Sequence, residues 1–125
     1  MNGFEPFHPE NSLAQVRLEI SSFGDVDVIC PIGQIDFMQI PSARIQIEDL
    51  IRRGHVKLVL DMSQCDYMAS STVGMLLKKA NELRITGGEL KLASVPRRIM
   101  SVLALLGVED SFRVYPSADE AVASF

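Results

Sequence analysis

The sequence predicts a single α/β domain with a mixed, mostly parallel sheet of four to five strands and about four helices. Short runs of alternating or β-branched apolar residues are separated by longer segments with apolar residues at helical spacing, and two of the short runs meet at a tight turn. The chain has 125 residues, 47% apolar and 22% charged, which fits one globular domain. We expect a loose leader over residues 1–11 and a folded domain over residues 12–125.

The first half of the domain predicts a hairpin, a helix and a strand. Residues 13–22 and 26–30 alternate between apolar and polar side chains on either side of a turn at residues 23–25, which predicts the hairpin. Apolar residues then recur every three or four positions over residues 40–51, which predicts a helix. The short, β-branched run at residues 55–61 is typical of a strand that is covered on both faces.

The second half of the domain alternates between helices and strands. The apolar stripe of residues 70–85 predicts a long helix. After it we expect a strand over residues 89–95, a helix over 96–106, a strand over 112–115 and a helix over 118–125. The order is therefore β-β-α-β-α-β-α-β-α. Strands joined by crossover helices are parallel, whereas the opening hairpin adds an antiparallel strand.

Charge and composition exclude several classes of partner. The net charge is −4 and no Lys/Arg-rich run occurs, so we expect no nucleic-acid partner. No window approaches the ~18 apolar residues of a membrane span, and the N-terminus does not resemble a secretory signal. We therefore expect a cytoplasmic protein without direct membrane insertion. Cys30 and Cys65 form no CxxC pair and are expected to be reduced thiols packed as small hydrophobes.

Chemistry is expected at the carboxyl ends of the parallel strands, where ligands of open α/β sheets bind. Ser70, Ser71 and Thr72 stand at the start of a helix, where free N–H groups and the helix dipole favour an anion. A phosphate on Ser70 would add about −1.5 to −2 charges and would oppose docking of an acidic or apolar partner. The alternative is that these hydroxyls only cap the helix. Gly74 could likewise only permit close helix packing.

Four short motifs in the sequence have the spacings of one family. They are Gly33-Gln34-Ile35-Asp36 after the second strand, Asp61-Met62-Ser63 after the third, Ser70-Ser71 with Val73 and Gly74 at the helix start, and the Gly87-Gly88 turn. With these motifs, residues 13–125 resemble a STAS domain, the fold of bacterial anti-sigma factor antagonists. The family's regulated serine falls on Ser70. Two positions depart from the family pattern: Ala69 replaces an acidic residue, and Thr72 replaces a glycine.

The resemblance implies a switch in which an ATP-using anti-sigma serine kinase phosphorylates Ser70 and a phosphatase restores it. The unmodified protein would bind the anti-sigma factor and so release a sigma factor. Because Thr72 would add bulk on the surface that a kinase approaches, Ser71 or Thr72 could be modified instead. The alternative, which Ala69 favours, is an unphosphorylated scaffold or partner subunit in a stress-signalling complex or a transporter ATPase assembly.

The expected partner-binding surface gathers at the same edge of the sheet. It comprises Gly33, Asp36, Phe37, Met38, Asp61, Ala69, Ser71, Thr72, Gly74 and Arg97. Phe37 and Met38 could form a docking patch or be partly buried under the next helix. Asp36 and Asp61, at strand ends, could instead be turn or cap residues. Arg97 stands at a helix start, where a positive charge opposes the dipole, which slightly favours an interaction role; the alternative is a solvated surface residue.

The residues argue against an enzyme. A receiver domain with Asp61 as phosphoacceptor needs an acidic pair on the first strand, but residues 13–22 contain only Glu19. A hydrolase with Ser70 as nucleophile needs an activating base, and His55 belongs at the opposite edge of the sheet. His8 and His55 have no partner at ligand spacing, so we expect no metal and no cofactor.

Overall fold

The computed structural model describes residues 15–125. In chain order its elements are β1 (Arg17–Phe23), β2 (Val26–Ile35), α1 (Ile40–Arg52), β3 (Lys57–Asp61), β4 (Cys65–Met68), α2 (Ser70–Ile85), β5 (Glu89–Ala93), α3 (Arg97–Leu105), a 3₁₀ turn (Glu109–Ser111), β6 (Arg113–Tyr115) and α4 (Ala118–Ala123). The predicted single α/β domain is confirmed. The expected leader at residues 1–11 and the first residues of the expected first strand lie outside the described residues.

The predicted hairpin is present. β1 and β2 pair antiparallel from Arg17 opposite Ile32 to Phe23 opposite Val26, and Gly24 enters the two-residue turn with a φ of +65°. A positive φ is readily adopted only by glycine, and glycine in the first central position is typical of a type II′ hairpin turn. β2 continues five residues beyond its expected end at residue 30, as far as Ile35.

The sheet is mixed and mostly parallel, as predicted. Its order is β1-β2-β3-β5-β6, and each neighbouring pair from β2 to β6 is parallel. β4 was not predicted, and it pairs parallel to the last residues of β2. A bulge at Gly33, with a φ of +92°, marks the point where β2 turns from β3 to β4. The sheet therefore has one strand more than expected.

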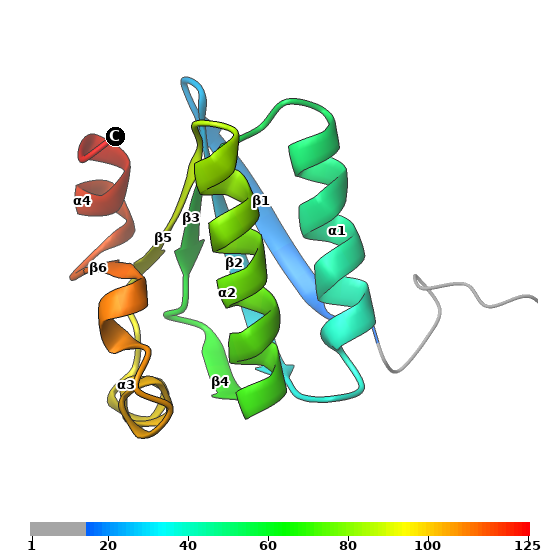
Figure 1. Ribbon diagram of the computed structural model, residues 1–125, viewed down its shortest axis with the longest axis vertical. Coiled ribbons are helices and arrows are strands. Elements are labelled where there is room, and N and C mark those ends of the chain that lie inside the picture. Colours follow the sequence, from blue (N-terminus) through cyan, green and yellow to red (C-terminus); the bar gives the residue numbers. More distant parts are fainter. Residues whose placement is uncertain (1–14) are drawn as a thin grey trace, which may run out of the picture.

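Helices cover both faces of the sheet. α1 and α2 lie side by side on one face (Figure 1), where they bury the main core with Leu58 and Leu60 of β3. Val59, between those two leucines, belongs to a smaller cluster that α4 closes through Ala121. Because successive side chains of a strand point to opposite faces, α4 covers the face opposite to α1 and α2. β3 is therefore buried on both faces, as its sequence predicts.

The carboxyl edge of the sheet is the edge where β2, β3, β4 and β5 end. It lies at the bottom of Figure 1, and α1 and α2 both begin there. The C-terminus of the chain lies at the opposite end of the sheet. The loops after β2, β3 and β5 thus share one edge with the start of α2.

Candidate functional site

The first turn of α2 carries backbone donors without acceptors. Ala69 is the N-cap residue, and its methyl side chain offers no acceptor. The N–H groups of Thr72 and Val73 donate to the Ala69 carbonyl at 3.0 and 3.2 Å. Within residues 15–125, the N–H groups of Ser70 and Ser71 make no backbone hydrogen bond. This helix start therefore presents two free N–H groups at the positive end of the helix dipole.

The three hydroxyls of this turn do not share one environment. Ser70 and Ser71 are exposed, whereas Thr72 is fully buried. The prediction that Thr72 belongs to the partner-binding surface, adds bulk there, or accepts a phosphate is therefore wrong. Thr72 stands four residues before Leu76 on the buried stripe of α2, so helical periodicity turns its side chain inward.

The buried Thr72 hydroxyl connects α2 to the end of β2. Its Oγ1 donates to the Ile35 carbonyl at 2.7 Å, and the N–H of Ala69 donates to the same oxygen at 3.2 Å. Threonine at this position thus occupies space in the core and satisfies a backbone acceptor. The two hydrogen bonds hold the start of α2 against the loop that follows Ile35.

That loop displays two apolar side chains. Asp36 accepts the N–H of Met38 on its carboxylate at 3.0 Å and donates its own N–H to the Gln39 side chain at 3.0 Å. The side chains of Phe37 and Met38 remain 75% and 60% exposed. Their exposure contradicts the alternative that they are partly buried under the next helix. Asp36 orders this loop through a local turn, which is the role of a positioning residue.

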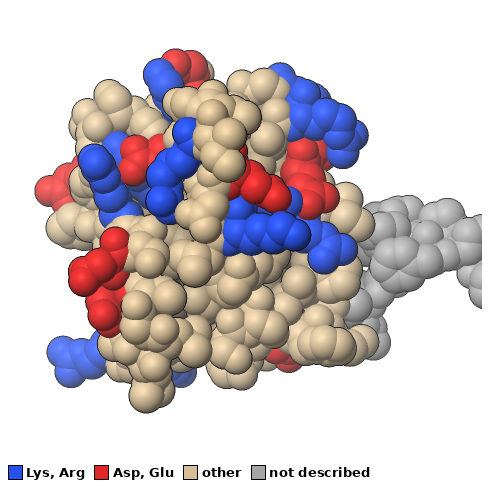
Figure 2. All heavy atoms as spheres, viewed as in Figure 1, with Lys and Arg blue, Asp and Glu red and all other residues tan. Residues whose placement is uncertain are grey.

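Tyr67 is a candidate site residue that the sequence analysis missed. It lies on β4, opposite Gln34 of β2, and its side chain is 47% exposed. Phe37, Met38 and Tyr67 share the carboxyl edge with Ser70, and we call these three residues the apolar edge patch. Figure 2 shows few charged side chains on the lower part of this face, over the start of α2. Only recognition of β4 from its four-residue sequence would have pointed to Tyr67.

Of the remaining predicted residues, Gly74 and Arg97 lie on the surface, whereas Asp61 and Gly33 shape the backbone. Gly74 is exposed one helical turn after Ser70, and a Cβ added to it would meet nothing within 4 Å, so close packing does not explain it. Arg97 is exposed at the start of α3. Asp61 accepts the N–H of Ser63 at 3.0 Å and so shapes the turn after β3. Gly33 forms the bulge of β2, where its N–H donates to the Gln64 carbonyl.

Among the described residues, His55 and the two cysteines lie in different parts of the domain, and Cys65 donates its thiol hydrogen to the Tyr67 carbonyl at 3.4 Å. His55 lies before β3, at the opposite edge of the sheet, with its Nδ1 2.5 Å from the buried Asp27 carboxylate. Cys30 and Cys65 are free thiols, and burial raises the pKa of both. Residues 15–125 contain no group of three His, Cys, Asp or Glu side chains that could hold a metal, and His8 lies outside them. Among the described helices, none is both long and apolar enough to cross a membrane.

Known proteins with this arrangement include named regulators of sigma factors. BtrV of Bordetella bronchiseptica, named as a candidate anti-sigma factor antagonist, is 24% identical over 110 residues, which are 88% of this chain and 95% of BtrV. TM1081 of Thermotoga maritima, also named as a candidate antagonist, superimposes with a TM-score of 0.81 at 18% identity, over 86% of this chain and 92% of TM1081.

Two further structures show how widely the fold is used. The phosphorylated form of the Bacillus cell fate determinant SpoIIAA superimposes with a TM-score of 0.67 at 22% identity, over 87% of this chain and 97% of SpoIIAA. A domain of the murine anion transporter Slc26a9 superimposes with a TM-score of 0.70 at 18% identity, over 83% of this chain and 18% of the transporter. These likenesses establish the fold. Because the STAS domain family model matches residues 17–121, the chain belongs to the STAS domain family.

Proposed function

We propose that this protein is a phosphorylation-switched binding module that antagonises an anti-sigma factor in the cytoplasm. In the unmodified state, its carboxyl edge binds an anti-sigma factor that is also an ATP-dependent serine kinase, and a sigma factor is released. That kinase transfers the γ-phosphoryl group of ATP to the Ser70 hydroxyl and leaves ADP, and a phosphatase hydrolyses the phosphoserine. The observation that carries the proposal is the exposed Ser70 at the start of α2, beside the apolar edge patch.

A phosphate on Ser70 is compatible with the folded domain. The Ser70 hydroxyl makes no hydrogen bond within residues 15–125, so its modification breaks none there. The new charge of about −1.5 to −2 would lie next to the free N–H groups of Ser70 and Ser71 and at the positive end of the α2 dipole. Phosphorylation would therefore alter the surface and leave the packing of α2 unchanged.

The same charge would oppose docking of a partner on the apolar edge patch. A partner that covers Phe37, Met38 and Tyr67 also removes water from the neighbouring Ser70. Burial of an ionised group without a matching cation is unfavourable, so the phosphoserine would weaken the complex. Ser71, Gly74 and Arg97 border this surface in the proposal. The names of BtrV and TM1081 and the phosphorylated form of SpoIIAA support the proposal by analogy.

The second candidate is a scaffold that uses the same edge without phosphorylation. Ala69 favours this alternative, because the side chain before Ser70 offers a kinase neither a charge nor a hydrogen-bonding group. In the transporter Slc26a9, a domain of this fold is part of a much longer chain. A scaffold would need the apolar edge patch but not the Ser70 hydroxyl.

Phosphorylation of the purified chain distinguishes the two candidates. The chain would be incubated with ATP and the ATP-binding anti-sigma factor with which it co-purifies, and intact mass would be measured. We expect the addition of one phosphate that Ser70→Ala abolishes and Ser71→Ala preserves. A phosphate that persists in Ser70→Ala would contradict the assignment of Ser70. Stable binding with no added phosphate would contradict the switch and support the scaffold.

A further inference from the structure

Within residues 15–125, the strand β1 forms a free edge of the sheet. It pairs with β2 over all seven of its residues, and no other described strand pairs with it. The other strands with an unpaired edge, β4 and β6, have only four and three residues. An unpaired strand edge carries N–H and C=O groups that can pair with another strand. β1 contains no proline, lysine or bulge, which are features that commonly block such pairing.

The hairpin determines which backbone groups of β1 point outward. Phe23 and Val26 close the two-residue turn, and in such hairpins the closing pair exchanges hydrogen bonds. Because backbone groups alternate in direction along a strand, the even-numbered residues of β1 direct their N–H and C=O groups away from β2. These outward residues are Leu18, Ile20 and Ser22.

Just before β1, helix α1 already covers the outward groups. The N–H of Val16 donates to the Ser42 hydroxyl at 3.1 Å, and the Val16 carbonyl accepts from the Gln46 side chain at 3.1 Å. At the other end, the hairpin turn limits the edge. The free segment of the edge therefore runs from Leu18 to Ser22 and is symmetric about Ile20.

We propose that this edge binds a second copy of the chain, with the two β1 strands antiparallel and Ile20 opposite Ile20. In this register, Leu18 of each copy lies opposite Ser22 of the other. All outward N–H and C=O groups of Leu18, Ile20 and Ser22 then have partners. The symmetry of the free segment favours a second copy over an unrelated strand, because a two-fold axis through Ile20 satisfies both edges at once.

The side chains of β1 complement one another in the same register. Arg17 of each copy lies opposite Phe23 of the other, on the face of the sheet that carries α4. Phe23 is 53% exposed and lines a groove that also contains the carboxylates of Glu19, Asp61 and Asp119. The Arg17 guanidinium, whose ion pair within its own chain is with Glu19 at 2.6 Å, would meet an aromatic ring and an acidic groove. This charge complementarity supports self-association through β1.

The proposed dimer goes beyond the switch and does not depend on it. Because the two β1 strands are antiparallel, the carboxyl edges of the two copies point in opposite directions, and both Ser70 sites remain free. A single strand pair buries less surface than the roughly 1,200 Å² at which stable interfaces begin. The dimer is therefore weak and forms at high protein concentration.

Sedimentation equilibrium of the full chain, from micromolar to millimolar concentration, tests the proposal. We expect a monomer–dimer equilibrium, and Ile20→Lys should raise the dissociation constant by at least about tenfold because two ammonium groups would meet at the axis. Val114→Lys, on the β6 edge, is the matched control and should leave the equilibrium unchanged. Both positions are similarly exposed, 43% and 37%, so both variants should fold.

Amide hydrogen exchange identifies the register. As concentration rises, the amides of Leu18, Ile20 and Ser22 should exchange more slowly, whereas those of Glu19 and Ser21, already paired with β2, should not change. A monomer at every concentration would overturn the proposal. So would a dimer that Ile20→Lys leaves intact, because such a dimer would form through another surface.

Discussion

Neighbouring residues at the start of α2 have different tasks, and their spacing on the helix explains why. Ser70 and Gly74 are four residues apart and lie on one exposed face. Thr72, between them, points into the core and donates to Ile35. The exposed Ser70 is thus only two positions away from Thr72, which supports the fold.

Gly74→Ala should change the stability of the chain and its affinity for a partner in opposite directions. No atom lies within 4 Å of the position that a Cβ would take at Gly74, so alanine fits without a clash. Because alanine favours a helix over glycine by about 1 kcal/mol, we expect the free energy of unfolding in urea to rise by about 0.5–1 kcal/mol. If the face of Ser70 and Gly74 docks the partner, the added methyl group weakens binding measured by calorimetry.

Gly88→Ala serves as the control for this substitution. A Cβ at Gly88 would collide with the Val56 carbonyl oxygen, so this variant should lose stability. A Gly74→Ala variant that is stabilised and binds the partner normally would exclude Gly74 from the binding surface.

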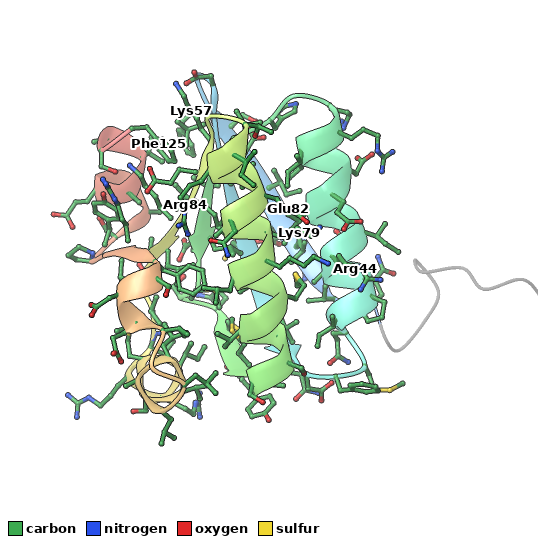
Figure 3. All side chains as sticks on the ribbon, viewed as in Figure 1. Arg44, Lys57, Lys79, Glu82, Arg84 and Phe125 are labelled. Atoms are coloured by element: carbon green, nitrogen blue, oxygen red, sulfur yellow. The ribbon has the colours of Figure 1, made fainter. Side chains whose placement is uncertain are left out.

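At the scale of elements, α1 and α2 are joined by a buried lysine. Lys79 of α2 contacts Glu48 of α1 at 2.5 Å and Glu82 at 2.9 Å, and Figure 3 shows it reaching toward α1. Burial alone would lower the pKa of Lys79, but the hydrogen bonds and the charge attraction of the two glutamates together outweigh burial and raise that pKa. The hydrogen bond from Lys79 in turn lowers the pKa of Glu48 below its usual 4.5.

The Lys79–Glu48 pair predicts that the stability of the chain depends on pH. Because the pKa of Glu48 is lowered by folding, its contribution is present above about pH 4.5 and is lost as the pH falls through the lowered pKa. We expect Glu48→Gln to lose less unfolding free energy than the native chain between neutral and acidic pH, as measured by urea denaturation. The control is Glu109→Gln, which alters a carboxylate outside this pair. Parallel pH profiles for the native chain and Glu48→Gln would contradict the prediction.

Most elements could be predicted from periodicity, but β4 could not. Its residues, Cys65–Met68, have their two ends buried and their middle exposed, so no alternation distinguishes them from a loop. β4 exists because β2 extends beyond β3 at the Gly33 bulge and offers it a free edge. This is a tertiary effect, and Tyr67 was missed with it.

The candidate site was predicted unevenly for a related reason. The position of Ser70 follows from the helix boundary, which local sequence determines. The inward direction of Thr72 could have been obtained from its spacing to Leu76, but the resemblance to the family placed it on the surface. The exposure of Phe37 depends on how Asp36 and Gln39 fold the loop, which no periodicity describes.

At the scale of the whole molecule, the proposed switch site and the packed core lie in different places. The core lies between the sheet and its helices, and the proposed phosphorylation site lies at the rim. A charge added at Ser70 would be solvated, whereas a charge added at the buried Thr72 would not.

Two acidic substitutions test this separation. Ser70→Glu places a carboxylate in the first turn of α2, so we expect the free energy of unfolding to stay within about 0.5 kcal/mol of the native value. Thr72→Glu would bury a carboxylate without a cation and should unfold the chain, as circular dichroism would show. Unfolding of Ser70→Glu would mean that phosphorylation acts by disrupting the fold.

The distance between the C-terminus and the carboxyl edge has a practical consequence. Phe125 ends the chain over the Lys91 ammonium group, 3.9 Å from the ring centre, at the end of the sheet opposite to the start of α2. A reporter fused after Phe125, or a sensor chip coupled through it, would stand clear of Ser70. Immobilisation through Phe125 should therefore leave the proposed binding surface around Ser70 turned toward the solution.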